Sequence, residues 1–190
     1  RTSNAPHLYY PNPRGPGGRG ECEDWMLKNI NEDPLVGCDM TTTAENCAAK
    51  WGIPTAEQHA VALRRRQQYD DALRDGAAFQ RRYMQLPFPV PDTGFARTLA
   101  MLDGDEGIHP TTAEGLARLR PVKPGGTVTY GGQTHPADGA AGMLITTADM
   151  AREVAADRTI GIRIARNGLA RTDPGYMPAA TVPAARRALA

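Results

Sequence analysis

Residues 125–144 read GGTVTYGGQTHPADGAAGML and predict a strand, a glycine turn, a polar loop and a second strand. Val128 lies between two threonines, a pattern typical of a half-buried strand. Gly131 and Gly132 permit a sharp turn because neither residue carries a Cβ. Residues 140–145 form an almost polar-free run, which favours a strand buried on both faces. A polar loop between two buried strands commonly presents backbone amides to a ligand, so we expect a binding loop here.

The length and the charge of the chain limit the kinds of protein and of partner that are compatible with the sequence. The 190 residues suffice for one or two domains with a sizeable core, and the formal net charge is +1. Such a charge favours neither nucleic acid nor an anionic membrane surface as a partner. No apolar run approaches the roughly 20 residues that span a bilayer. The sequence shows no signal peptide and begins on Arg1, so we expect a fragment or processed product of a cytoplasmic protein.

The cysteines and histidines give no metal or catalytic pattern. Three cysteines without CxxC spacing indicate reduced, partly buried thiols of a cytosolic protein, although a catalytic thiol is the open alternative. The four histidines are scattered, which argues against zinc. The acidic residues around 103–106 lack the 12-residue pattern of a calcium loop. We therefore expect no metal site. The residues concerned are Cys22, Cys38, Cys47, His7, His59, His109 and His135.

Threonine-led capping boxes predict three helices in the middle of the chain. A capping box places a threonine hydroxyl on a backbone amide three residues on, while a glutamate or glutamine reaches back. The boxes at residues 42–45, 55–58 and 111–114 predict helices over about 43–50, 55–74 and 111–119. Gly76 is expected to stop the second of these helices.

The remaining segments divide into short helices, strands and irregular chain. Helices are expected near residues 25–30, 146–156 and 184–190, and a turn at residues 173–175. The proline- and glycine-rich residues 1–20 predict an extended arm, and residues 79–110 an irregular segment. Isoleucines alternate with other residues over 159–166, which predicts a strand with one exposed face.

Five short segments, in order and at agreeing spacing, resemble the thiolase family over nearly the whole chain. Each motif is weak alone, and the set together is specific. The segments are Ser3-Asn4-Ala5-Pro6-His7; Met40-Thr41-Thr42-Thr43-Ala44-Glu45-Asn46; Leu119-Arg120-Pro121 with Gly126-Thr127-Val128-Thr129; Asp138-Gly139-Ala140-Ala141; and Asp173-Pro174 with Val182-Pro183-Ala184.

The resemblance implies an α/β fold, part of the layered αβαβα thiolase architecture with an inserted loop domain. Residues 1–40 would end the first half and enter the loop domain, and residues 41–124 would form that mostly helical domain. Residues 125–157 would return to the first-half sheet, and residues 158–190 would begin the second half.

The resemblance also implies acyl transfer between coenzyme A (CoA) thioesters. Thiolases condense two acyl-CoA molecules, or cleave a 3-ketoacyl-CoA with CoA, through an acyl-cysteine intermediate. By that resemblance the nucleophilic cysteine precedes Arg1, and the Asn-Glu-Ala-Phe, Gly-His-Pro and second-cysteine motifs follow Ala190. We therefore expect no catalytic residue in this chain. His135-Pro136 lies at the loop position and does not match the Gly-His-Pro site.

What the resemblance places in this chain is the CoA-binding part of the site. Thr134 matches a hydroxyl that contacts a pantetheine amide, and Tyr130, Gln133 and Pro136 match neighbouring pantetheine-lining positions. Met40 matches a methionine of the acyl pocket. A plain turn threonine and a core methionine remain the alternative interpretations of Thr134 and Met40. The family usually carries a small residue where Tyr130 stands.

Two other functional interpretations stay open beside the thiolase-type acyltransferase. One is a non-catalytic, thiolase-like partner subunit that binds CoA or acyl groups, and the other is an unrelated α/β structural domain. The expected partners are acyl-CoA substrates, further thiolase segments or a complementary chain, and other copies in a homo-oligomer. No cofactor is expected besides the CoA thioester that serves as substrate.

Overall fold

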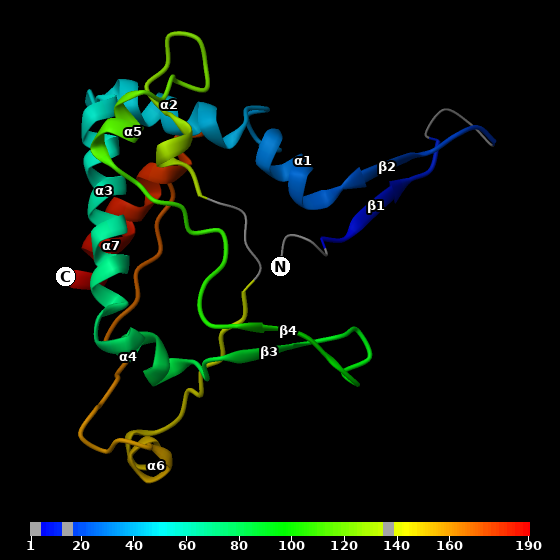
Figure 1. Ribbon diagram of the computed structural model, residues 1–190. Coiled ribbons are helices and arrows are strands. Elements are labelled where there is room, and N and C mark those ends of the chain that lie inside the picture. The colour runs from blue at the N-terminus through cyan, green and yellow to red at the C-terminus, as the bar shows by residue number, and fades with distance from the viewer. Residues whose placement is uncertain (1–4, 13–16, 135–138) are drawn as a thin grey trace. The chain divides into compact units, whose positions relative to one another are not determined.

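The computed structural model describes residues 5–12, 17–134 and 139–190. The regular elements of the described chain are helices and two antiparallel hairpins, joined by long irregular segments, in agreement with the predicted α/β class (Figure 1). The chain forms two compact units, one of residues 1–51 with 136–190 and the other of residues 52–135. Among the described residues, no helix is long and apolar enough to cross a membrane.

The first unit opens with a hairpin that leads into a short helix. Strand β1 (His7–Tyr10) pairs antiparallel with β2 (Glu21–Asp24). Helix α1 (Trp25–Asn31) begins where the Asp24 carboxylate accepts a hydrogen bond from Leu27 N at 2.9 Å, and it confirms the helix predicted near residues 25–30. The prediction of an irregular arm over residues 1–20 is wrong for β1, because its pairing partner lies too far along the chain to be recognised locally.

Helix α2 (Met40–Trp51) carries much of the buried surface of the first unit. Thr43, Cys47 and Ala48 are buried along it. The predicted helix is confirmed, but its cap is Asp39 and not a threonine: the Asp39 carboxylate accepts from Thr42 N at 2.6 Å.

The C-terminal part of the first unit packs against α2. Asn46 Nδ2 donates to Gly175 O at 3.0 Å, within the predicted turn at residues 173–175. That turn leads through η3 (Met177–Ala180) into α7 (Thr181–Leu189), which confirms a C-terminal helix.

Helix α6 (Ala148–Val154) also confirms a prediction, with the Thr147 hydroxyl accepting from Met150 N at 3.3 Å.

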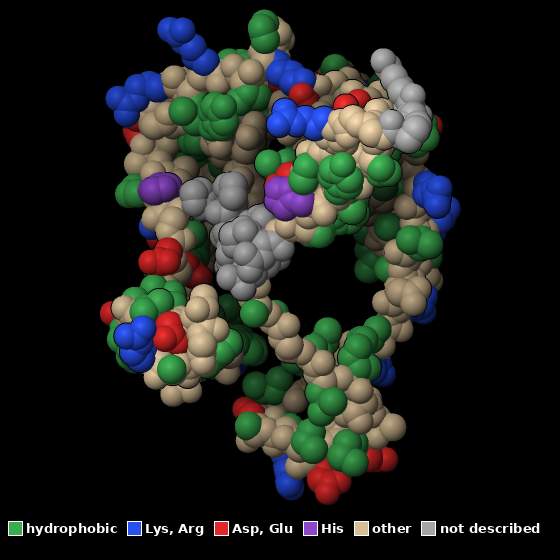
Figure 2. Space-filling model, turned by 90° about the vertical axis from the view of Figure 1, so that its right-hand side faces the viewer, with side chains coloured by type: hydrophobic (Ala, Val, Ile, Leu, Met, Phe, Trp, Pro, Cys, Tyr) green, Lys and Arg blue, Asp and Glu red, His purple; other side chains and the backbone are tan. Residues whose placement is uncertain are grey.

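Two predicted strands of the first unit are absent from the described structure. Residues 140–145 and 159–166 take no strand conformation, because no described strand lies beside them to complete a ladder. Their apolar side chains are exposed, as Met143 at 78 % and Ile162 at 84 % show. The expected burial of residues 140–145 on both faces is therefore wrong. Figure 2 shows hydrophobic side chains at the surface in several places on the visible face.

The second unit begins with two consecutive helices. Helix α3 (Thr55–Ala72) confirms the predicted long helix, and α4 (Arg74–Tyr83) follows it directly. Asp75, Gly76 and Ala77 have positive φ, so the helical path breaks at the predicted stop and then resumes.

A second hairpin corrects the prediction for residues 79–110. Strand β3 (Phe88–Pro91) pairs antiparallel with β4 (Thr98–Leu102), with a register shift at Val90–Pro91. The prediction of irregular chain is wrong here and over the end of α4. Prolines on an edge strand are compatible with pairing when their missing N–H faces away from the partner.

The core of the second unit lies around α5 (Ala113–Ala117). The helix predicted from the box at residues 111–114 is confirmed, but its cap lies one residue later than the box predicts: the Thr112 hydroxyl accepts from Gly115 N at 3.0 Å. Leu116, Val128 and Thr129 are buried at 5 %, 7 % and 1 % exposure. The strand predicted around Val128 is reduced to an isolated bridge between Pro121 and Thr129, because no further strand adjoins it in the described chain.

Candidate functional site

The loop predicted to bind a ligand is anchored at its start to the first turn of α3. Thr55 Oγ1 donates to Thr127 O at 2.8 Å, and Gln58 Nε2 donates to Thr127 Oγ1 at 3.0 Å. The capping-box interpretation of residues 55–58 is wrong, because Pro54 is the N-cap and makes no side-chain cap bond. The polar side chains expected to cap the helix instead hold the chain that enters the loop.

A further contact from the same helix reaches Thr129. Nε2 of His59 lies 2.8 Å from Oγ1 of Thr129, and the imidazole tautomer decides which atom donates. Thr129 is 1 % exposed, so its hydroxyl is satisfied inside the unit. Residues 55, 58 and 59 share one face of α3 at i, i+3 and i+4 spacing.

The loop then makes a tight 3₁₀ turn, η2 (Tyr130–Gly132). Gly132 N donates to Thr129 O at 3.1 Å, and Gln133 N donates to Tyr130 O at 3.2 Å. At Gly131 an added Cβ would overlap the side chain of Leu116, because the backbone lies directly on α5. The inner side of the turn is thus fixed by packing, while the Tyr130 side chain is 74 % exposed.

Three of the five predicted site residues come together at this turn. Tyr130 opens it, and Gln133 and Thr134 follow it with exposed side chains. Met40 is the first residue of α2 in the other unit, where it is half-buried and its carbonyl accepts from Thr43 Oγ1 at 2.8 Å. Pro136 lies outside the described residues.

Sequence reasoning missed the three α3 side chains that hold the loop. The sequence predicts Thr55 and Gln58 as parts of a capping box, and it presents His59 as one of four scattered histidines. Their shared helical face was the available signal, although the sequence could not show that residues 127–129 pack against it. A contact across about 70 positions is set by tertiary structure, and local pattern does not encode it.

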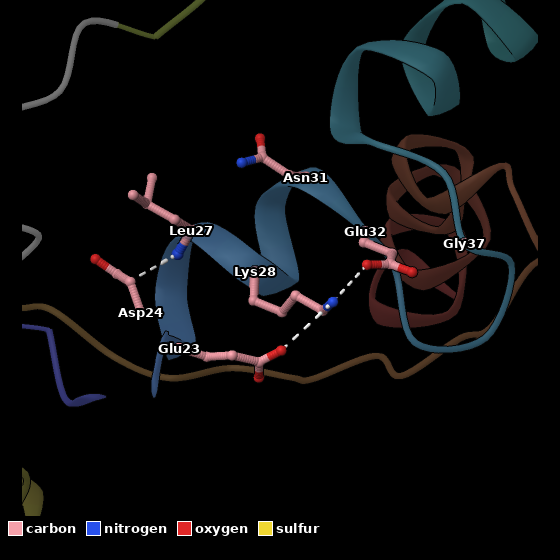
Figure 3. Close-up of a pocket in the computed structure, with 7 residues that line it drawn as sticks. All are labelled: Glu23, Asp24, Leu27, Lys28, Asn31, Glu32 and Gly37. Atoms are coloured by element: carbon pink, nitrogen blue, oxygen red, sulfur yellow. Dashed lines mark hydrogen bonds and ion pairs between the residues drawn. The ribbon is translucent and has the colours of Figure 1, made fainter. Parts of the chain in front are cut away.

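A cavity of about 410 Å³ lies beside α1, away from the predicted loop residues in sequence (Figure 3). Lys28 bridges two carboxylates there, at 3.4 Å from Glu23 and 2.6 Å from Glu32. Hydrogen bonding and charge from Glu32, and then from Glu23, raise the pKa of Lys28. Carboxylates outnumber the single paired cation, so this cavity disfavours phosphate groups. The lining residues are Glu23, Asp24, Leu27, Lys28, Asn31, Glu32 and Gly37.

The thiols and metal-ligand side chains form no site in the part of the chain that is described. Cys22 is exposed, Cys38 is half-buried and Cys47 is buried, and all three are free of disulfide bonds. No group of histidine, cysteine or carboxylate side chains in the described ranges could hold a metal ion.

These observations define the class of the protein: an α/β chain that carries an anchored, glycine-containing polar loop. The sequence profile of the thiolase N-terminal domain matches residues 2–149, and the chain belongs to the thiolase family.

Curated relatives agree with this assignment. The chain is 34 % identical over 189 residues to an acetyl-CoA acetyltransferase of Paracoccus denitrificans, covering 98 % of this chain and 46 % of the relative. It is 37 % identical over 153 residues to a 3-ketoacyl-CoA thiolase of Vibrio vulnificus, covering 79 % and 38 %. It is also 34 % identical over 141 residues to peroxisomal 3-ketoacyl-CoA thiolase B of Rattus norvegicus, covering 73 % and 32 %. The chain therefore spans less than half the length of these relatives.

Proposed function

We propose that this chain supplies the coenzyme A-binding part of a thiolase-type acyl-CoA acyltransferase. Membership of the thiolase family and the names of the relatives support this class of activity. The observation that carries the proposal is the turn of residues 130–132, which is pinned on its inner side and followed by the exposed Gln133 and Thr134. A rigid backbone with polar side chains facing outward suits a flexible, amide-bearing ligand.

In this proposal Thr134 hydrogen-bonds a pantetheine amide, and Tyr130, Gln133 and Pro136 line the same arm. Met40 borders the acyl group. The reaction is Claisen condensation or thiolytic cleavage of a 3-ketoacyl-CoA through an acyl-cysteine intermediate. The nucleophilic cysteine and its activating histidine belong to other thiolase segments, so this chain binds and orients the thioester. The thioester is the substrate, and no further cofactor takes part.

A non-catalytic CoA- or acyl-binding partner subunit is the second candidate. The Tyr130 ring supports it, because 74 % of this large side chain is exposed at a position where thiolases usually carry a small residue. A ring of this size would narrow the path of the pantetheine arm. Both candidates share CoA binding and differ in whether acyl transfer follows.

The setting proposed for the protein is the cytoplasm, as a homo-oligomer that works with the remaining thiolase segments or a complementary chain. Two of the relatives are peroxisomal proteins of the rat, so location varies within the family. Neither nucleic acid nor membrane is proposed as a partner.

Alkylation of the intact protein with iodoacetamide separates the two candidates. The enzyme requires one fast-reacting cysteine outside Cys22, Cys38 and Cys47 that acyl-CoA protects. Peptide mapping by mass spectrometry identifies the labelled thiol. If acyl-CoA protects no thiol, while CoA still binds, the partner-subunit candidate replaces the enzyme.

A further inference from the structure

We propose that His59 and Thr129 form a positioning pair that sets the turn of residues 130–132 for the pantetheine arm. The proposal rests on the proposed function, because it assigns a role within the same CoA-binding loop. Neither residue touches the ligand in this proposal. They act through the backbone that carries Tyr130, Gln133 and Thr134.

Burial makes the Thr129 hydroxyl dependent on its partner. At 1 % exposure, Thr129 exchanges no hydrogen bond with bulk water, and a buried hydroxyl without a partner is costly. His59 Nε2 meets this hydroxyl at 2.8 Å. The contact joins residues 70 positions apart, so it ties the loop to α3 independently of chain connectivity.

Thr129 is also the residue from which the turn starts. Its backbone is extended, with φ −110° and ψ 168°, and its carbonyl accepts from Gly132 N at 3.1 Å. A rotation of Thr129 would therefore redirect the carbonyl that closes the turn. Because Gly131 already touches Leu116, the turn cannot absorb such a rotation by moving inward.

The other two contacts from α3 to this segment end two residues earlier in the chain. Thr55 and Gln58 both bond Thr127, which precedes the turn by three residues. They fix the path of the entering segment, whereas His59 fixes the residue that directly adjoins the turn. Loss of the His59 contact should thus change the orientation of the turn at residues 130–132, with little effect on the packing of α3.

Two matched pairs of substitutions test the proposal in the full 190-residue chain. His59→Gln keeps a nitrogen at about the reach of Nε2, whereas His59→Asn is polar but too short. Thr129→Ser keeps the hydroxyl, whereas Thr129→Val replaces it by a methyl group of similar volume. CoA affinity is measured by isothermal titration calorimetry, and the thermal midpoint of each variant by circular dichroism.

We expect His59→Asn and Thr129→Val each to weaken CoA binding by roughly three- to tenfold, the effect of one lost hydrogen bond. His59→Gln and Thr129→Ser should bind as the unsubstituted chain does, within a factor of about two by the same reasoning. The double variant His59→Asn/Thr129→Val should bind no more weakly than either single variant, because both remove the same contact.

Equal affinities within each matched pair would overturn the positioning role. So would losses that simply add in the double variant, or losses that follow the thermal midpoint and not the presence of the hydrogen bond. If the unsubstituted chain fails to bind CoA, the proposed function falls, and the positioning role with it. If the unsubstituted chain binds CoA and all the variants bind it equally well, only the positioning role is contradicted, and the proposed function stands.

Discussion

Thr134 is the residue on which the proposed recognition of the ligand rests most directly. Its side chain is exposed just beyond the pinned turn, where it can meet a ligand without rearrangement of the core. A single hydroxyl adds specificity because an amide that loses its partner on binding is left desolvated. The alternative, a threonine that merely suits a turn, predicts no effect on ligand affinity.

Replacing Thr134 by valine should weaken CoA binding by about fivefold, the cost of one neutral hydrogen bond. Calorimetric titration measures the change. Thr146→Val is the matched control, because Thr146 is exposed in the other unit and belongs to no predicted site. Equal affinity of the Thr134→Val and Thr146→Val variants would leave Thr134 as a turn residue.

Asp92 illustrates how one carboxylate can organise a hairpin turn. It accepts a hydrogen bond from Ala96 N at 2.8 Å, and Arg97 Nε lies 3.4 Å from it. The Ala96 amide is the main reason why the pKa of Asp92 is lowered below its usual 3.8. Because the folded pKa is depressed, this group stabilises the hairpin above pH 3.8, and the stabilisation is lost as pH falls through the folded pKa.

An NMR titration of the Ala96 amide should therefore show a midpoint below 3.8. In Asp92→Asn the same resonance should not titrate in this range, because the amide side chain carries no charge. A midpoint at or above 3.8 in the unsubstituted chain would contradict the hydrogen-bonded carboxylate.

Helices and strands differ in how far the sequence predicts them. Thr147 marks a helix start as predicted, and the cap of α5 lies only one residue after the predicted position, because a cap and its amide lie within three residues of one another. The sequence does not reveal the hairpins, because the partner of β1 begins eleven residues after that strand ends and because β3 contains prolines, which are unusual in strands. The segments at 140–145 and 159–166 have strand-like patterns but no described partner strand. The hydrophobic pattern alone therefore predicts strands that the described structure does not contain.

The candidate site shows the same division. The turn and its exposed polar residues could be read from glycines and polar side chains that are close in sequence. The anchoring by His59 could not, because its partner lies 70 positions away. Thr55 fits a local capping-box motif, but in the structure its hydroxyl bonds the distant Thr127 carbonyl and does not cap the helix.

The close approach of η2 to α5 provides a test with a built-in control. A Cβ added at Gly131 would overlap Leu116 and lie 2.9 Å from Leu119 Cδ1, whereas one at Gly132 would meet only Gln58 Oε1, at 4.0 Å. Gly131→Ala should lower the free energy of unfolding by roughly 1–3 kcal/mol, the usual cost of overpacking. Gly132→Ala should change it much less.

Urea denaturation of both variants measures the difference. Equal stabilities would contradict the placement of the turn against α5. A greater loss for Gly132→Ala would likewise reverse the assignment of the inner and outer sides of the turn.

The described chain as a whole leaves many large apolar side chains at its surface. Leu144 is 72 % exposed and Ile145 is 68 % exposed beside Met143, and Ile160, Ile162 and Ile164 are open as well. Exposed apolar segments with unpaired backbone favour association with another chain. This agrees with the proposed assembly into a homo-oligomer or with further thiolase segments.

We therefore expect the chain to self-associate as its concentration rises. Replacing Met143, Leu144 and Ile145 together by serine should shift the distribution towards monomer. Sedimentation velocity measures both effects. The surface substitution Val61→Ser serves as control, since Val61 is an isolated exposed apolar residue of α3. A strictly monomeric chain at all concentrations would contradict the expectation.

In our proposal the turn at residues 130–132 is one wall of a channel for the pantetheine arm of CoA. A crystal structure of the protein with bound CoA would show the path of this arm. We predict the arm alongside Tyr130 and Gln133, with Thr134 Oγ1 within hydrogen-bonding distance of a pantetheine amide. An arm that passes elsewhere and leaves Thr134 in contact with solvent would contradict the claim.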